Sequence, residues 1–283
     1  MKNFWKNKKV VITGSRGFVG YNLLKELQKR KANIIEIPFA NNGFPNFDDS
    51  YVFHLGAKAI VGDVKENPKE AFDANIKGTY DLLEACRLSN PKKVIIASTD
   101  KVYGEGLNKN EYHNLNGLYP YDVSKHCADK LAQCYWKSYN MPIAITRFVN
   151  IYGEGDKHLS RIIPYIISQT LKNKPIEIRS DGKSIRDFIY IKDVINGYLK
   201  LAESKQNGVF NFGTNSQIEV IALVKTILKL TKSRSKIKIL NIAKNEIREQ
   251  SVNSLKSRIL LNWYPKYSLE QGLKQTIKWW KKK

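Results

Sequence analysis

The distribution of apolar residues predicts alternating strands and helices over the first half of the chain. The β-branched run at 9–13 stops at a glycine, which is typical of a buried strand. The next segment, 18–30, repeats its apolar residues at helical spacing, through Phe18, Val19, Leu23, Leu24 and Leu27. The same reasoning predicts strands at 33–37, 51–55, 93–98 and 143–148, and helices at 68–87 and within 117–139. This alternation indicates an α/β fold, a doubly wound parallel sheet of the Rossmann type covered by helices on both faces.

After about residue 150 the pattern changes to shorter strands and helices, with one further strand near 209–212. We expect a smaller lobe, built around the carboxyl edge of the sheet. The sequence therefore predicts a dinucleotide-binding Rossmann domain over residues 1–150, which also receives about 187–213. The C-terminal substrate-binding lobe would consist of residues 151–186 and 214–283.

Three glycines, Gly14, Gly17 and Gly20, lie between the first strand and the first helix. Glycine at this spacing permits a tight turn, close approach of the backbone to a pyrophosphate, and close packing of the helix on the strand. The helix N-terminus offers free N–H groups and a partial positive charge to the phosphates. We therefore predict a dinucleotide site whose contacts include Gly14, Arg16, Gly17, Phe18, Val19 and Gly20. The alternative is a glycine-rich turn that binds no ligand.

The second strand lacks a terminal acidic residue, which many dinucleotide sites use to hold the ribose hydroxyls. It ends at Ile37-Pro38, and Glu36 comes one position too early. Residues 38–50 form the whole connection to the third strand, and a single crossover with its helix already needs at least about 10–12 residues. We therefore predict that one edge strand and its crossover are missing, which leaves the adenosine side open. Arg16 could face a 2′-phosphate, so NAD is predicted without excluding NADP.

Tyr121 and Lys125 are four residues apart in a predicted helix and so share one of its faces. A lysine ammonium near a phenol favours the phenolate, and a positive nicotinamide ring would add to this effect. The phenolate could then act as a general base toward an alcohol. The pair predicts redox chemistry at a hydroxyl group.

Thr99, Asp100 and Lys101 follow the fourth strand, at the edge of the sheet where ligands bind in such folds. Thr99 could hydrogen-bond the reacting hydroxyl, and Asp100 could give a proton to a leaving group. Lys101, if neutral, could remove a proton bound to carbon. The alternative is a polar loop with one helpful hydroxyl and two solvated charges.

The chain carries 48 Lys and Arg against 26 Asp and Glu, a formal charge of +22. The lysines are scattered, and no nucleic-acid motif accompanies them, so we interpret them as a solvated surface that also attracts an anionic nucleotide. Cys86, Cys127 and Cys134 lack metal-ligand spacing, so no metal site is predicted. The first apolar run is too short for a signal peptide or membrane span, and we predict a cytoplasmic protein.

These segments resemble the extended short-chain dehydrogenase/reductase superfamily, the NAD-dependent nucleotide-sugar epimerases and dehydratases. The resemblance rests on Thr13-Gly-x-x-Gly17-x-x-Gly20, Phe53-His-Leu-Gly-Ala57, Asn75-Ile-Lys-Gly-Thr79, Tyr121-x-x-x-Lys125, Arg147-Phe-Val-Asn150-Ile-Tyr-Gly153 and Arg186-Asp-Phe-Ile-Tyr190. Within the superfamily the chain is similar to CDP-glucose 4,6-dehydratase, through Phe4-Trp5, Thr99-Asp100-Lys101, Pro120–Lys125 and Arg179–Gly182.

The resemblance implies an internal redox cycle on a nucleotide-diphosphate hexose. Tyr121 would take the C4 hydroxyl proton while a hydride passes to NAD, Lys101 would remove the C5 proton, and Asp100 would protonate the departing C6 hydroxyl. The hydride would then return to C6, giving a 4-keto-6-deoxy sugar. The further cofactor contacts implied are Leu55, Gly56, Ala57, Asn75, Ser98 and Phe148, and the substrate contacts are Asn150, Arg161 and Arg186. A homodimer paired through two helices is also implied.

Two other functions remain open at this stage. A 4-epimerase or keto-reductase would not need Asp100 and Lys101. A catalytically inactive, nucleotide-sugar-binding paralogue is favoured by the shortened cofactor region and opposed by the intact Tyr121 and Lys125.

Overall fold

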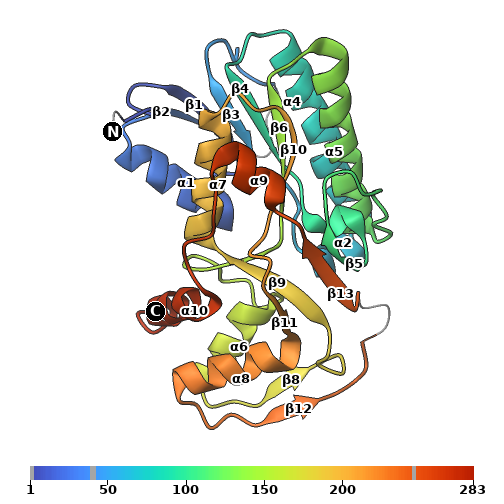
Figure 1. The fold of residues 1–283 in the computed structure, drawn as a ribbon, viewed down its shortest axis with the longest axis vertical. Coiled ribbons are helices and arrows are strands. Elements are labelled where there is room, and N and C mark those ends of the chain that lie inside the picture. The colour runs from blue at the N-terminus through green and yellow to red at the C-terminus, as the bar shows by residue number, and fades with distance from the viewer. Residues whose placement is uncertain (1–2, 39–42, 244–246) are drawn as a thin grey trace.

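The computed structural model describes residues 3–38, 43–243 and 247–283 (Figure 1). Its main sheet has six strands, all parallel, in the order β10-β6-β4-β3-β1-β2. The strands are β1 (Lys9–Thr13), β2 (Asn33–Ile37), β3 (Tyr51–His54), β4 (Lys93–Ala97), β6 (Ile143–Phe148) and β10 (Gly208–Phe212). The predicted α/β fold with a parallel Rossmann-like sheet is confirmed.

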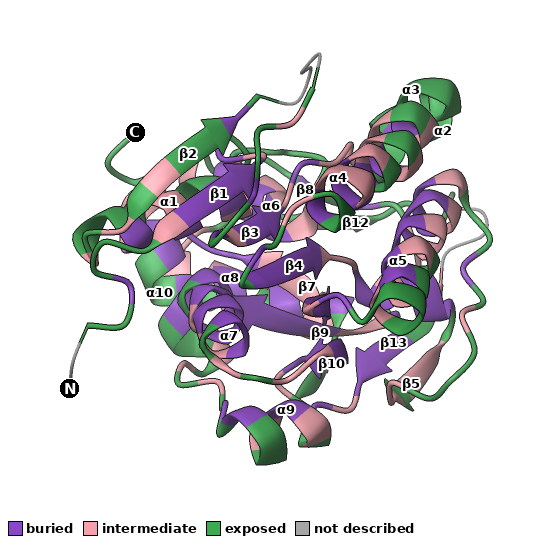
Figure 2. Cartoon of the chain, turned by 90° about the horizontal axis from the view of Figure 1, so that it is seen from above, coloured by how far each residue is buried: buried purple, intermediate pink, exposed green. Residues whose placement is uncertain are grey.

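Successive residues of β1 point to opposite faces of the sheet, and each face has its own apolar core. Val10 and Ile12 pack with Leu23 of the helix α1 (Phe18–Lys29) and with α7 (Ile191–Glu203). Val11 faces the other way and packs with Leu82 of α4 (Gly78–Arg87) and with α5 (Pro120–Tyr139). Continuous apolar runs in the central strands therefore reflect burial on both faces (Figure 2).

β2 is the last strand at one edge of this sheet, and most of its residues are exposed or half-buried (Figure 2). Ile37 is buried together with Phe47, which follows in the connection to β3. Residues 43–50 contain no helix or strand, as expected if an edge strand and its crossover are missing; residues 39–42 of the predicted gap lie outside the described residues.

A smaller lobe lies below the carboxyl edge of the main sheet in Figure 1. It contains a mixed sheet of β11 (Gln217–Glu219), β9 (Ile185–Tyr190), β13 (Glu249–Val252) and β5 (Gly106–Lys109), with β7 (Asn150–Tyr152) paired to β9. A two-stranded sheet joins β8 (Ile176–Ile178) to β12 (Ile237–Ile239). Besides α7, the helices of this half of the chain are α6 (Ile162–Leu171), α8 (Val220–Thr231), α9 (Leu255–Leu261) and α10 (Leu269–Trp280). The domain boundaries given above remain a prediction.

The single helix predicted over 68–87 is wrong in detail. It consists of α3 (Pro68–Phe72), a π-helical turn η1 (Asp73–Lys77) and α4, and it is preceded by a short helix α2 (Val61–Glu66). Apolar spacing could not reveal the wider turn, which is associated with contacts to distant parts of the chain. Asn75 in this turn bonds to the backbone of Lys58 and to the Ser124 hydroxyl of α5. Such π turns are frequent at functional sites.

We predict that Gly20→Ala destabilises the fold. A Cβ at this position would lie 2.1 Å from the carbonyl oxygen of Gly14, so α1 would have to move away from the glycine-rich turn. Overpacking of this kind costs about 1–3 kcal/mol, to be measured by urea unfolding. Gly62→Ala is the control, since nothing lies within 4 Å of a Cβ there. In its helix alanine should be neutral or stabilising by up to about 1 kcal/mol. Equal stability of the two variants would contradict this explanation.

Candidate active site

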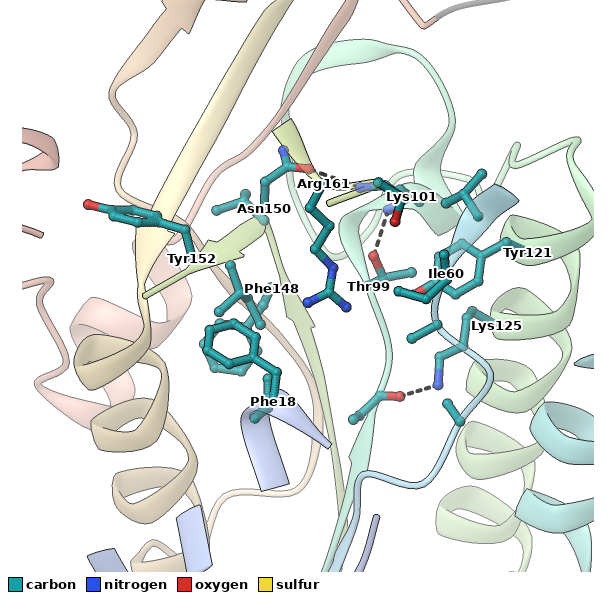
Figure 3. A pocket seen from close by; sticks show the side chains of 18 of the residues that line it. Phe18, Ile60, Thr99, Lys101, Tyr121, Lys125, Phe148, Asn150, Tyr152 and Arg161 are labelled. Atoms are coloured by element: carbon teal, nitrogen blue, oxygen red, sulfur yellow. Dashed lines mark hydrogen bonds between the residues drawn. The ribbon is translucent and has the colours of Figure 1, made fainter. Parts of the chain in front are cut away.

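Two adjoining cavities of about 380 and 290 Å³ lie at the carboxyl edge of the main sheet. The smaller one is bordered by the glycine-rich turn, and the larger one extends past Thr99 and Tyr121 toward the C-terminal lobe (Figure 3). They share a wall of predominantly apolar residues and one arginine: Phe18, Val19, Leu55, Ala57, Ala59, Ile60 and Arg161. An elongated ligand can therefore run from the glycine-rich turn to the catalytic residues.

The smaller cavity has features that suit the pyrophosphate of a dinucleotide. Gly14, Gly17 and Gly20 line it, and Gly17 precedes α1 without a side-chain cap, so no side chain takes the place of a pyrophosphate. Gly14 has a φ of +71°, and a Cβ there would lie 2.6 Å from the Gly56 nitrogen. The residues present thus fit a dinucleotide phosphate. Arg16 is exposed and lines neither cavity, so its predicted contact stays a prediction.

A chain of buried hydrogen bonds joins this turn to the catalytic helix. The Thr13 hydroxyl bonds to His54 Nδ1 at 2.8 Å, and His54 Nε2 bonds to the Thr79 hydroxyl at 3.1 Å. Thr79 donates to the carbonyl oxygen of Asn75, whose side chain reaches Ser124 on α5. Burial lowers the pKa of His54 to about 3, so its ring is neutral. Asn75 lines neither cavity, so its predicted contact with the cofactor stays a prediction.

Tyr121 and Lys125 lie one turn apart on α5 and both line the larger cavity (Figure 3). The pKa of Tyr121 is raised to about 12, first by burial and then by the Asp100 carboxylate, while Arg161 and the Thr99 hydroxyl act in the opposite direction. The acidifying effect of Lys125 on this tyrosine stays a prediction. The Lys125 ammonium donates to the carbonyl oxygen of Ala97 at 2.5 Å. Tyr121 is therefore a phenol at neutral pH.

Thr99, Asp100 and Lys101 lie at the end of β4, where the chain enters a 3₁₀ turn (Asp100–Tyr103). Asp100 is almost completely buried, and its Oδ1 accepts from the Thr99 hydroxyl at 3.2 Å and from Lys101 Nζ at 3.5 Å. Its Oδ2 has no partner among the described residues. Thr99, Lys101 and Ser98 line the larger cavity together with Tyr121. Asp100 lines neither cavity itself, so the structure places the predicted base and hydroxyl at the cavity wall and the predicted acid in contact with both behind it.

The three predicted substrate contacts are placed differently. Asn150 lines the larger cavity, where its side-chain oxygen accepts from Lys101 Nζ at 3.2 Å. Arg161 extends into the cleft, and Phe148 lines the cavity opposite Tyr121 (Figure 3). Arg186 lines neither cavity, because its guanidinium donates to the backbone carbonyls of residues 185, 247 and 248. Contact of Arg186 with a diphosphate therefore stays a prediction.

One further carboxyl group near the site was not singled out from the sequence. Asp122, next to Tyr121 in α5, is 3% exposed. Its pKa is raised to about 6 by burial, although the Lys101 ammonium acts in the opposite direction. Lys101 thus lies near two carboxyl groups. The position of Asp122 beside Tyr121 was visible in the sequence. Helical periodicity could not show that Asp122 and Lys101 lie close together.

We predict that Lys125 gives the fold a specific pH dependence. Burial lowers the pKa of folded Lys125 to about 8, whereas its value in an unfolded chain is about 10.4. Between these values the unfolded chain binds more protons, so the contribution of Lys125 to stability rises with pH, by at most about 1.4 kcal/mol per pH unit. Urea unfolding at about pH 7 and pH 9 should show wild type gaining stability relative to Lys125→Met. Burial also lowers the pKa of Lys93 to about 8, but Lys93 is present in both proteins, so its effect cancels. A difference that does not change with pH would contradict the prediction.

Residues 10–213 match the NAD dependent epimerase/dehydratase family. The chain belongs to this family. The predicted membership of the extended short-chain dehydrogenase/reductase superfamily is thereby confirmed, as is the prediction of an enzyme. The family description supports NAD as the cofactor type.

Individual relatives carry out different named reactions. A dTDP-D-glucose 4,6-dehydratase of Dictyostelium discoideum is 31% identical over 271 residues, which cover 79% of this chain and 62% of that relative. UDP-glucuronic acid decarboxylase 6 of Arabidopsis thaliana is 25% identical over 306 residues, or 96% of this chain and 88% of that one. The crystal structure of UDP-glucose 4-epimerase from Thermotoga maritima, with UDP-glucose, has a TM-score of 0.90 at 26% identity, covering 97% of this chain and 99% of that one. The chain thus spans less than two thirds of the Dictyostelium relative.

Within the described residues, every helix is too short or too polar to cross a bilayer. The same residues contain no group of three or more His, Cys, Asp or Glu side chains placed to bind a metal ion. The three cysteines are free thiols. Cytoplasmic location stays a prediction.

Proposed function

We propose that the protein is an NAD-dependent nucleotide-sugar 4,6-dehydratase, acting on an NDP-hexose of the CDP-glucose kind. The observation that carries this proposal is the contact between Asp100 and Lys101 beside Thr99 and Tyr121. Oxidation of a hydroxyl group needs a base and a hydrogen-bond partner, which Tyr121 and Thr99 supply. Elimination of water needs an additional acid and an additional base, which are the two roles that Asp100 and Lys101 fit.

NAD, when bound, would accept a hydride from the sugar and later return it. The residues of this chain move the protons. Tyr121 takes the proton of the C4 hydroxyl, and Thr99 hydrogen-bonds the same oxygen. Lys101 then removes the C5 proton, which the neighbouring ketone makes acidic, while Asp100 gives its proton to the C6 hydroxyl that leaves as water.

The proton count closes over Tyr121, Lys101 and Asp100 together. Elimination turns a neutral amine and a carboxylic acid into an ammonium and a carboxylate, which is the ion pair that the structure contains, with Nζ and Oδ1 3.5 Å apart. The product needs a proton at C5, which the Lys101 ammonium gives back, and the proton that Tyr121 took from the C4 hydroxyl replaces the one that Asp100 gave away.

A 4-epimerase is the nearest alternative, and the UDP-glucose 4-epimerase structure gives it support. It would use Thr99, Tyr121 and Lys125 without an acid–base pair for elimination. A keto-reductase would consume reduced cofactor in proportion to product, and an inactive nucleotide-sugar-binding protein would show neither reaction. The buried Oδ2 of Asp100 has no partner within the described ranges of the chain, which is destabilising and rare in folded proteins. A role for this carboxyl group in elimination would explain why it is kept, and this favours the dehydratase.

The test is to incubate the protein and NAD with CDP-, dTDP-, GDP- and UDP-hexoses and to measure product masses. Loss of one water without net reduction of the cofactor would support the proposal and identify the base. An unchanged mass with an altered sugar configuration would indicate an epimerase, and loss of carbon dioxide from a hexuronic acid a decarboxylase. No reaction with any substrate would favour the inactive alternative.

We also propose that the protein is a homodimer paired through α4 and α5, which lie side by side on the outside of the molecule (Figure 1). Tyr80 of α4 is 46% exposed and Tyr139 of α5 is 54% exposed, and aromatic residues are enriched in interfaces. The mass of one chain is 32.5 kDa, and light scattering should give twice this value. A monomer at micromolar concentration would contradict the proposal.

A further inference from the structure

The segment between β7 and α6 places a buried carboxylate against the arginine of the cleft. Asp156 is 1% exposed, and its Oδ1 accepts from Arg161 Nη1 at 3.0 Å and from the backbone N–H of His158 at 3.3 Å. The carboxylate thus holds the guanidinium at one end. Asp156 lines neither cavity, so it can act on a ligand only through Arg161.

Arg161 lies at the junction of the two cavities and lines both. In Figure 3 its guanidinium points between Phe18 and Phe148 on one side and Thr99 and Tyr121 on the other. Its charge lies 5.8 Å from the centre of the Phe18 ring, and the side chain is 32% exposed. The position is therefore accessible both to a ligand at the glycine-rich turn and to one beside Tyr121.

The contact between Asp156 and Arg161 uses few of the available groups. A guanidinium has five N–H donors, and one of them bonds to Asp156, the one hydrogen bond that the described residues give this side chain. Asp156 Oδ2 has no partner in the described part of the chain. Most donors of Arg161 are thus left for a ligand, although the side chain itself is anchored.

The other cations of the cleft have different partners. Lys125 donates to Ala97, and Lys101 contacts Asp100 and Asn150. Lys58 of the smaller cavity pairs with a glutamate of the same wall, Glu70. Arginine is also the residue whose planar fork matches phosphate oxygens in a two-point contact. Arg161 is accordingly the cation best suited to a diphosphate at this junction.

We infer that Asp156 is a positioning residue that holds Arg161 at the junction of the two cavities, with its remaining N–H donors available to a bound diphosphate. The inference rests on the proposed function, since a nucleotide sugar carries a diphosphate. NAD carries one as well, so the chemistry is shared and binding experiments must separate the two sources. Arg161 is one of the groups that lower the pKa of Tyr121, so its position also affects the catalytic phenol.

Binding should be measured by calorimetry for NAD alone and for CDP, dTDP, UDP and GDP individually. We expect Asp156→Ala and Arg161→Met each to weaken the same ligand about tenfold. The double variant should bind no more weakly than Arg161→Met, because residues acting through one contact are not additive. Arg161→Lys should recover part of the affinity, and Asp156→Glu should bind better than Asp156→Ala. Weakening of NAD alone would assign the contact to the cofactor, and weakening of a nucleoside diphosphate alone to the substrate.

A purely structural role for Asp156 predicts different results. The unfolding temperature of Asp156→Ala would fall while its affinities stayed at the wild-type values, or the two single losses would add in the double variant; either outcome overturns the inference. Glu26→Gln is the matched control. Glu26 lies on α1 and pairs with Arg30, which follows that helix, and neither residue lines a cavity. This variant should leave all affinities unchanged. These are binding measurements, so absence of water loss from any sugar would refute the dehydratase without affecting this result.

Discussion

Tyr121→Phe is expected to lower the turnover number by about 10²–10⁴-fold, the usual contribution of a general base in contact with its substrate. Phenylalanine keeps the ring in its buried place and removes only the oxygen that receives the C4 proton. The pKa of Tyr121 is raised to about 12 by burial and by Asp100, so the ligand-free enzyme holds it as a phenol. Binding of a positively charged nicotinamide ring and of the substrate must favour the phenolate.

The measurement is the rate of product formation at saturating substrate and NAD, together with the unfolding temperature. Tyr112→Phe is the matched control, because Tyr112 is 89% exposed and should change neither quantity. We expect substrate affinity to change little in Tyr121→Phe, since the hydroxyl acts on the reacting oxygen. A variant that keeps more than a tenth of the wild-type turnover number would show that Tyr121 is not the base.

Asp100→Asn is expected to abolish water loss, with a decrease of about 10²-fold or more, while leaving oxidation at C4 in place. An amide cannot donate the proton that the C6 hydroxyl needs, but Tyr121, Thr99 and Lys125 are unchanged. If Lys101 still removes the C5 proton, substrate recovered from deuterated water should carry deuterium at C5. Such exchange without elimination would separate the acid from the base.

The matched control is Asp49→Asn. Asp49 lies on the surface with its side chain 74% exposed, paired with Lys92, and has a φ of +57° that asparagine also tolerates. It should lose water from the substrate at the wild-type rate. Unchanged water loss by Asp100→Asn would remove the main support for the dehydratase and leave the epimerase as the better explanation.

The features that could be predicted from the sequence are those set by a short stretch of residues that also forms part of the site. The strand that ends at Gly14 and the one-turn spacing of Tyr121 and Lys125 each fix a backbone geometry without reference to the rest of the chain. The alternation of elements predicted the parallel sheet, and the short connection after Ile37 predicted that an edge strand and its crossover are missing; in the structure β2 is the edge strand.

The features that could not be predicted depend on contacts between distant segments. The π-helical turn at Asn75 is associated with contacts to Lys58 and Ser124, which no periodicity in residues 68–87 shows. The raised pKa of Tyr121 arises from its burial and from Asp100, which outweigh the opposite effects of Arg161 and the Thr99 hydroxyl. Arg186 is in a matching motif, yet its guanidinium bonds to carbonyls of the chain near residue 248. Asp156 has no distinctive local pattern, and its contact with Arg161 is seen only once the loop is folded.

The most direct test uses an NDP-hexose that carries deuterium at C4, chosen from the substrates that the enzyme accepts. We predict a product that has lost one water and carries the deuterium at C6, because the hydride removed from C4 is returned to C6 of the same sugar. The position of the label would be determined by nuclear magnetic resonance and the mass by spectrometry. A sugar of unchanged mass with deuterium still at C4 would contradict the dehydratase and indicate epimerisation or no catalysis.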